Sequence, residues 1–234
     1  MRNPVVAGRF YPAQKEELLS TIERYMQEVA PQPPAIATAV IAPHAGYIYS
    51  GRLAAQTLAS VSIPETILLL GPNHTGHGHT ASVSEQDWYT PLGKIPVNQR
   101  LTHSIITAND LFVIDESAHQ FEHSLEVQLP FLQYLQSQLS IAAITLKQMS
   151  YEKCEELATS LSCAIQEYNK PVLILASTDM SHYESRPSAS TKDALAISAS
   201  TEMNPLHLFT TVQENNISMC GVIPVVITML LSSK

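Results

Sequence analysis

Four short, continuously apolar runs, with segments of helical periodicity between them, constrain the fold of this chain most strongly. Continuous rather than alternating apolar residues are typical of strands that are covered on both faces. The runs occupy residues 38–42, 65–71, 140–146 and 171–177. Because strands that alternate with helices favour a parallel sheet, we expect a single α/β domain over residues 1–234, with a mostly parallel central sheet and helices on both faces.

The segments between and around these runs predict helices and one hairpin. Apolar side chains recur at helical spacing in residues 14–29, 52–59, 124–139, 151–168, 189–200 and 205–215, and from residue 219 onward. Residues 87–98, DWYTPLGKIPVN, predict a β-hairpin because Pro91 to Gly93 supply turn residues between two short runs.

Composition narrows the class of protein. Hydrophobic residues make up 45% of the 234 residues and charged residues 15%, which suits a folded core. A formal charge of −8 without a lysine- or arginine-rich run argues against a nucleic-acid partner. The N-terminus lacks the apolar stretch of a signal peptide, and no apolar run reaches the roughly 20 residues of a membrane helix. With only three cysteines, we expect a reduced, cytoplasmic protein without membrane contact.

Polar side chains follow three of the predicted strands at the point where each strand ends. His44 follows the first strand, His74 follows the second, and Asp179 and His182 follow the fourth. In open parallel sheets, ligands bind in the crevice beyond the carboxyl ends of the strands. A single histidine after a strand is more often a hydrogen-bonded loop residue, so it is the repetition that predicts a shared site. The order of the strands is not fixed by the sequence.

Two further positions each admit two interpretations. His123 and Glu126 lie one helical turn apart, a spacing that suits a metal site or a helix start capped by Ser124, and taken alone the helix start fits better. Cys220 lies at the predicted start of the final helix, where the helix dipole lowers the pKa of a thiol. The alternative for Cys220 is a small, buried apolar side chain.

Seven segments, in order along the chain, resemble the signature motifs of the Memo family: VAGRFYP, IAPHAGYIYSG, LLGPNH, DWYTPLG, EHSLEVQLPF, STDMSHY and SMCG. The prokaryotic members are usually labelled AmmeMemoRadiSam system protein B. The resemblance implies a fold like that of the class III extradiol ring-cleaving dioxygenases, which use non-haem iron. It also implies a metal site of His44, His74 and Cys220, with Asp179 and His182 in the same pocket and His182 at the position of an acid/base histidine. We expect further pocket residues at Tyr47, Tyr49, Asn73, His123 and Glu126.

Two departures from the dioxygenase pattern affect these expectations. The dioxygenases hold iron with two histidines and a carboxylate, whereas the third position here is the thiolate of Cys220. Because a thiolate is a softer ligand, we expect iron(II) as the cofactor, with copper and zinc also suited to the site. Family members generally continue to a final strand beyond the point where this sequence stops at MLLSSK, which indicates either a natural short form or a missing segment. Absence of this strand would leave a sheet edge open to a partner.

Three functions compete, in this order. The first is a metal-dependent redox enzyme of unknown substrate, in which His182 transfers a proton and Asp179 orients its ring or adds a ligand. The second is a non-enzymatic module that binds a peptide or a partner protein. The family label implies an AMMECR1-like protein and a radical SAM enzyme as partners. The third is a hydrolase with Cys220 as nucleophile, His182 as base and Asp179 as the orienting group.

Overall fold

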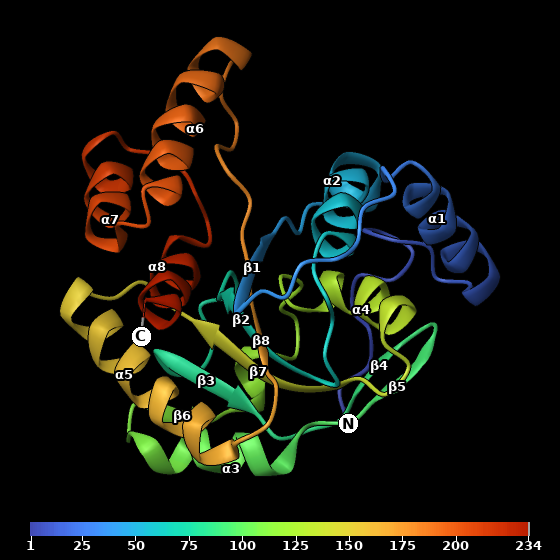
Figure 1. Cartoon of the computed structure of the whole chain (residues 1–234), viewed down its shortest axis with the longest axis horizontal. Helices are drawn as coiled ribbons and strands as arrows, with labels where there is room; N and C mark the ends of the chain where they lie inside the picture. The colour runs from blue at the N-terminus through green and yellow to red at the C-terminus, as the bar shows by residue number, and fades with distance from the viewer. Residues whose placement is uncertain (234) are drawn as a thin grey trace.

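A six-stranded sheet forms the centre of the computed structural model, which describes residues 1–233 (Figure 1). The strands lie in the order β1 (Ala39–Ala42), β8 (Leu173–Ser177), β2 (Thr66–Pro72), β7 (Ser140–Leu146), β3 (Ala81–Ser84) and β6 (Phe112–Ile114). The pairs β1–β8, β8–β2 and β2–β7 are parallel, whereas β3 runs antiparallel to β7. The predicted mostly parallel α/β sheet is therefore confirmed.

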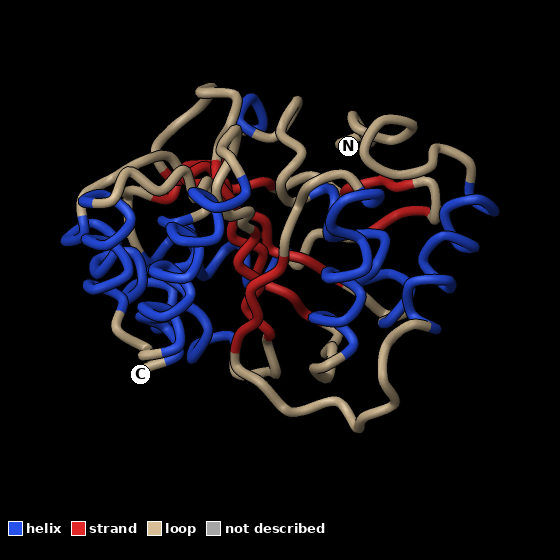
Figure 2. The backbone as a smooth tube through the Cα atoms, turned by 90° about the horizontal axis from the view of Figure 1, so that it is seen from above, coloured by secondary structure: helices blue, strands red, loops and turns tan. Residues whose placement is uncertain are grey.

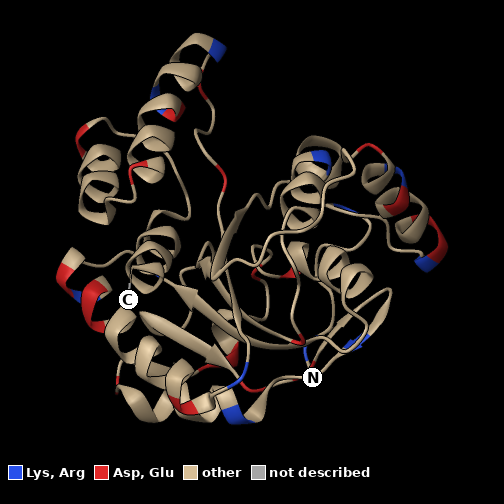
Figure 3. Ribbon diagram, in the orientation of Figure 1, with Lys and Arg blue, Asp and Glu red and all other residues tan. Residues whose placement is uncertain are grey.

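Helices cover both faces of this sheet, as the view from above shows (Figure 2). One apolar core joins the sheet to α1 (Lys15–Gln27), α2 (Tyr47–Ala59) and α4 (Leu129–Leu135). The other joins it to α3 (Gln99–Ala108), α5 (Tyr151–Tyr168), α6 (Arg186–Thr201), α7 (Pro205–Glu214) and α8 (Val222–Ser232). In Figure 1, α6 extends away from the sheet, and Figure 3 shows lysines and arginines scattered without a basic face. Within residues 1–233, no helix is long and apolar enough to cross a membrane.

The four predicted strands and the hairpin are confirmed, and the hairpin is β4 (Trp88–Thr90) with β5 (Gly93–Ile95). The short strands β3 and β6 were not predicted, because β3 carries two serines and neither strand is longer than four residues. The helix expected over residues 124–139 is instead a 3-10 turn, η2 (Glu126–Gln128), followed by α4. It ends early because Gln136 adopts an extended backbone conformation.

The start of the last helix differs from the prediction in a way that affects the site. Helix α8 begins at Val222, with Gly221 as its N-cap, so Cys220 precedes the helix instead of lying in its first turn. Cys220 therefore lies beside the N-terminal end of α8 but outside its first turn.

The buried side chain of Arg2 holds the N-terminal residues against the hairpin and against the loop that precedes α4. Its guanidinium forms an ion pair of 2.7 Å with the buried Glu126 and lies 4.0 Å above the ring of Trp88. The same group donates hydrogen bonds to the backbone carbonyls of His119 and Glu122. Arg2 thus fastens the loop that precedes α4 to the hairpin.

Replacing Arg2 by methionine should lower the free energy of unfolding by about 3–5 kcal/mol, because the charge of Glu126 is left buried without its partner. Arg52→Met is the matched control, since the Arg52–Glu28 pair is exposed and should contribute within about 1 kcal/mol. Urea unfolding of both variants measures the difference. Equal effects would contradict the structural role assigned to Arg2.

The buried ring of His119 makes stability depend on pH. Its Nε2 donates to the carbonyl of Ser82 at 3.0 Å, its Nδ1 has no hydrogen-bond partner among residues 1–233, and burial lowers its pKa from 6.5 to about 4. As the pH falls from 6.5 to 4, the unfolded chain binds a proton at His119 that the folded protein does not, so stability is lost in that window. The wild type should lose up to about 3 kcal/mol more than His119→Gln over that range. Urea midpoints of both proteins at several pH values measure this. If the two pH profiles were parallel, the pKa of His119 would be the same in the folded and unfolded states, which would contradict the prediction.

Candidate metal centre

The carboxyl ends of three adjacent strands, β1, β8 and β2, meet at one edge of the sheet. Ala42 of β1 pairs with Ser177 of β8, and Ala176 of β8 pairs with Leu70 of β2. The residues that follow these strands therefore emerge side by side, as the sequence predicted. Because β8 lies between the other two strands, the segment that follows it leaves the sheet between the ends of β1 and β2.

His44 is buried and is held in one tautomer. Its Nδ1 lies 2.8 Å from the hydroxyl of Ser177. That hydroxyl donates its single proton to the carbonyl of Ser124 at 2.7 Å and accepts from the Nε2 of Gln128 at 2.9 Å. Since the hydroxyl has no second proton to give, Nδ1 of His44 must donate to it. When its ring is neutral, His44 carries its lone pair on Nε2, the atom that faces Cys220.

His74 is held by a carboxylate that the sequence analysis did not single out. Its Nδ1 lies 2.8 Å from Oε1 of Glu122, which is fully buried. Burial raises the pKa of Glu122, but its hydrogen bond to His74 and the charge of His74 outweigh this and lower it to about 2. Burial lowers the pKa of His74, yet its hydrogen bonds to Cys220 and Glu122 raise it to about 10.

Cys220 contacts His44 from the turn before α8. Its Sγ lies 3.3 Å from Nε2 of His44, and the backbone N–H of Asp179 donates to Sγ at 3.2 Å. Burial raises the pKa of the thiol, but hydrogen bonds to His44 and His74 more than offset this and bring it to about 6. The histidines thus stabilise the thiolate, and Cys220 lies just before the helix whose first turn was predicted to hold it.

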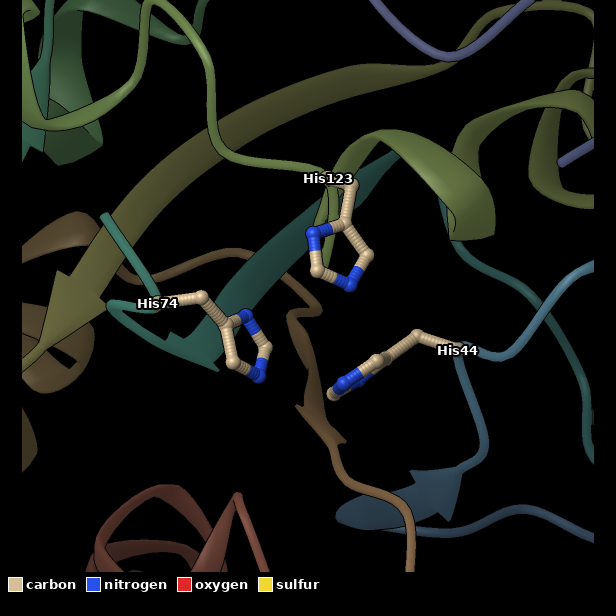
Figure 4. Close-up of side chains that lie close together, drawn as sticks. All are labelled: His44, His74 and His123. Carbon is tan, nitrogen blue, oxygen red and sulfur yellow. The ribbon is translucent and has the colours of Figure 1, made fainter. Parts of the chain in front are cut away.

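His123 completes the cluster, although its sequence position favoured a helix start. One ring nitrogen of each of His44, His74 and His123 lies within 4.8 Å of the others, and Figure 4 shows the three rings turned toward a common space. The ring of His123 stacks on that of His74 at 4.6 Å and packs against Phe10 at 4.8 Å. Burial lowers the pKa of His123 to about 4, so its ring is neutral at physiological pH.

Asp179 and His182 lie at the same edge but do not form the predicted pair. Oδ1 of Asp179 accepts the backbone N–H groups of His44 and Ala45, and Oδ2 lies 3.7 Å from Nε2 of His44. Nδ1 of His182 donates to the carbonyl of Ser218 at 2.8 Å. The ring of His182 is therefore oriented by Ser218 and not by Asp179, and the alternative role of Asp179 as a further ligand stays a prediction.

This arrangement also corrects the hydrolase interpretation. The base that contacts the thiol of Cys220 is His44, at 3.3 Å, and the carboxylate of Asp179 is engaged with His44 and its neighbouring backbone. A catalytic triad would need His182 to contact both the thiol of Cys220 and the carboxylate of Asp179. Instead, the thiol contacts His44, Nδ1 of His182 donates to Ser218, and Asp179 accepts from the backbone of His44.

Three of the expected pocket residues have other roles. Tyr47 is 2% exposed, and its hydroxyl donates to the carbonyl of Val127 at 3.0 Å, so it belongs to the core. Tyr49 is 82% exposed on the outer side of α2. Glu126 is fully buried and accepts hydrogen bonds from Tyr11 and from the N-terminal backbone in addition to its ion pair.

Asn73, the residue before His74, holds the loop that follows β2. Its Oδ1 accepts from the N–H of Gly76 at 2.9 Å, and its Nδ2 donates to the carbonyl of His77 at 2.7 Å. Of the five expected pocket residues, His123 is the one that the structure places in the histidine cluster. The sequence analysis missed Glu122 and Ser177. Glu122 directly precedes His123, and Ser177 is the last residue of the fourth predicted strand.

A parallel α/β sheet with histidines and a cysteine at its carboxyl edge defines a candidate metal-binding protein. The sequence model of one family, described as Memo-like protein, matches residues 2–234, and the chain therefore belongs to the Memo family. A MEMO1 family protein of Aquifex aeolicus is 40% identical over 232 residues, covering 97% of this chain and 84% of its own. Similar proteins of Methanococcus maripaludis strain C5 and Methanocaldococcus jannaschii are 39% identical over 241 residues and 38% over 251 residues. These two alignments cover 96% and 100% of this chain, and 85% and 87% of the relatives.

Gly221 permits the approach of Cys220 to the strand ends, because a Cβ there would lie 2.4 Å from the carbonyl oxygen of Ser177. Gly221→Ala should therefore displace Cys220 from His44 and destabilise the protein by about 1–3 kcal/mol. Gly46→Ala is the control near the site, since its Cβ would meet nothing closer than 3.5 Å. Urea unfolding and a crystal structure of each variant test this. Unchanged stability and an unchanged Sγ–Nε2 distance in Gly221→Ala would contradict it.

Proposed function

We propose that this protein binds one transition-metal ion through His44, His74 and Cys220 and uses it in a redox reaction on a small molecule. The observation that carries the proposal is the contact of 3.3 Å between Sγ of Cys220 and Nε2 of His44. The other nitrogen of this ring, Nδ1, donates its proton to Ser177. Once the proton shared between Sγ and Nε2 is removed, both atoms present lone pairs to the same space. Such an arrangement is suited to a cation, which would replace the protons that the thiolate and the imidazoles now share.

The donor set favours iron(II), with copper as the alternative that keeps the redox role and zinc as an ion that would bind without it. Two imidazoles and a thiolate combine borderline and soft ligands, which iron, copper and zinc accept and which magnesium and calcium do not prefer. A bound iron or copper ion supplies one-electron chemistry and a place for dioxygen or substrate. His123 faces the same space with a neutral ring.

His182 and Asp179 supply acid–base groups beside this site in the proposal. Because Nδ1 of His182 donates to the carbonyl of Ser218, its Nε2 is left to accept or release a proton. Oδ1 of Asp179 is committed to the backbone at His44 and Ala45, which leaves Oδ2 beside the His44 ring. Both residues can therefore act on a substrate proton without rearrangement of their hydrogen bonds.

Protein purified anaerobically, without chelator or affinity metal, should contain close to one iron or copper ion per chain by plasma mass spectrometry. Cys220→Ala and His44→Ala should lose the metal and keep the fold, because each removes one donor. Cys163→Ala is the matched control, since this cysteine is exposed on α5. Metal retained in His44→Ala would refute the assignment. A folded wild type without stoichiometric metal would favour the partner-binding role instead, to be tested by pull-down of AMMECR1-like and radical SAM proteins.

A further inference from the structure

Glu122 is a buried carboxylate whose two oxygens are fully used by the segments that carry two of the histidines. Oε1 lies 2.8 Å from Nδ1 of His74 and accepts the backbone N–H groups of His123 and Ser124, each at 2.9 Å. Oε2 accepts the backbone N–H of His74. Four donors thus converge on one side chain that is fully buried.

These contacts fix His74 at two points. The backbone N–H sets where the residue lies, and the Nδ1–H sets how its ring is turned and which nitrogen carries the proton. The Nε2 atom of His74 is then the nitrogen left for a ligand. Histidines that bind metals commonly donate their other ring N–H to a carboxylate, which orients the ring and strengthens it as a ligand.

The same carboxylate also ties together two segments that are distant in the sequence. His74 follows β2, whereas His123 lies in the loop before η2, and no backbone pairing joins these two segments at the site. Glu122 links them through its carboxylate, and the hydroxyl of Ser124 adds a hydrogen bond of 3.0 Å to the carbonyl of Pro72.

We propose that Glu122 is a positioning residue of the metal centre, which holds His74 in the tautomer and orientation that present its Nε2 to the ion and sets His123 beside it. This inference rests on the proposed function, because it assigns a role toward the metal that His74 would bind. Its structural alternative is that Glu122 only closes a loop.

Glutamine at this position separates the two roles. All four contacts of Glu122 are with N–H donors, and an amide offers one oxygen and one NH₂ group, so in either orientation the NH₂ group faces a donor. Glu116 offers a matched control, because it accepts hydrogen bonds from Ser84 and from the backbone of Glu85 and Gln86, away from the histidine cluster. Glu116→Gln therefore makes the same substitution in a loop-closing carboxylate.

The experiment measures Zn²⁺ affinity by competition with a chromophoric chelator and records the visible spectrum of the Co²⁺-loaded proteins. Glu122→Gln should bind Zn²⁺ about 10–100-fold more weakly than the wild type, whereas Glu116→Gln should match the wild type. In Glu122→Gln the Co²⁺ ligand-field bands should change while the thiolate charge-transfer band from Cys220 persists. A structural collapse would remove both features, and unchanged affinity and spectrum in Glu122→Gln would overturn the inference.

A measurement on the wild type keeps the inference testable if Glu122→Gln does not fold. In the Zn²⁺-loaded protein, ¹⁵N imidazole shifts should show His74 bound through Nε2 with a proton on Nδ1, and binding through Nδ1 would overturn the inference. Failure of the wild type to bind Zn²⁺ or Co²⁺ would refute the proposed function itself. Normal binding by both the wild type and Glu122→Gln would refute only the role of Glu122.

Discussion

Strand β8 hydrogen-bonds to β1 on one side and to β2 on the other, and this parallel pairing places the groups of the candidate metal centre. The register sets Ser177, the last residue of β8, beside Ala42 at the end of β1. That match allows the Ser177 hydroxyl to reach the ring of His44 two residues further on. A shift of one residue would turn the hydroxyl to the opposite face of the sheet, so the site depends on the register as well as on the order of the strands.

Behind the histidines lies a layer of buried polar groups whose hydrogen bonds determine what the rings can do. Ser177 and Gln128 fix the proton of His44, and Glu122 accepts the N–H groups around His74. Burying such groups is unfavourable unless they are hydrogen-bonded, and nearly every contact in this layer pairs a donor with an acceptor. The result is a rigid support from which the imidazoles project, and rigidity of this kind is what a metal site requires.

Electrostatics explain why the side chain of Cys220 can be a thiolate at the edge of the sheet. Cys220 is largely buried, which by itself would keep it protonated, but the rings of His44 and His74 stabilise the thiolate. His74 is in turn stabilised as a cation by Glu122 and Cys220. In the metal-free protein, two anionic groups, Cys220 and Glu122, therefore flank one cationic ring, and the same two anions would attract a divalent cation.

The sequence by itself determined most of the local features: the four buried strands from their continuous apolar runs, most helices from their periodicity, the hairpin from its turn residues, and two histidines from their positions at strand ends. It missed α3 and extended α4 at both ends. The features that it determined follow from contacts between residues close in the chain. The strand order, the partners of each histidine and the place of Cys220 outside its helix were decided by the tertiary structure alone. Glu122 lies 48 residues from His74, and Cys220 lies 176 residues from His44. No local pattern encodes which of several buried polar residues will meet across such separations, because that depends on how whole strands and loops pack.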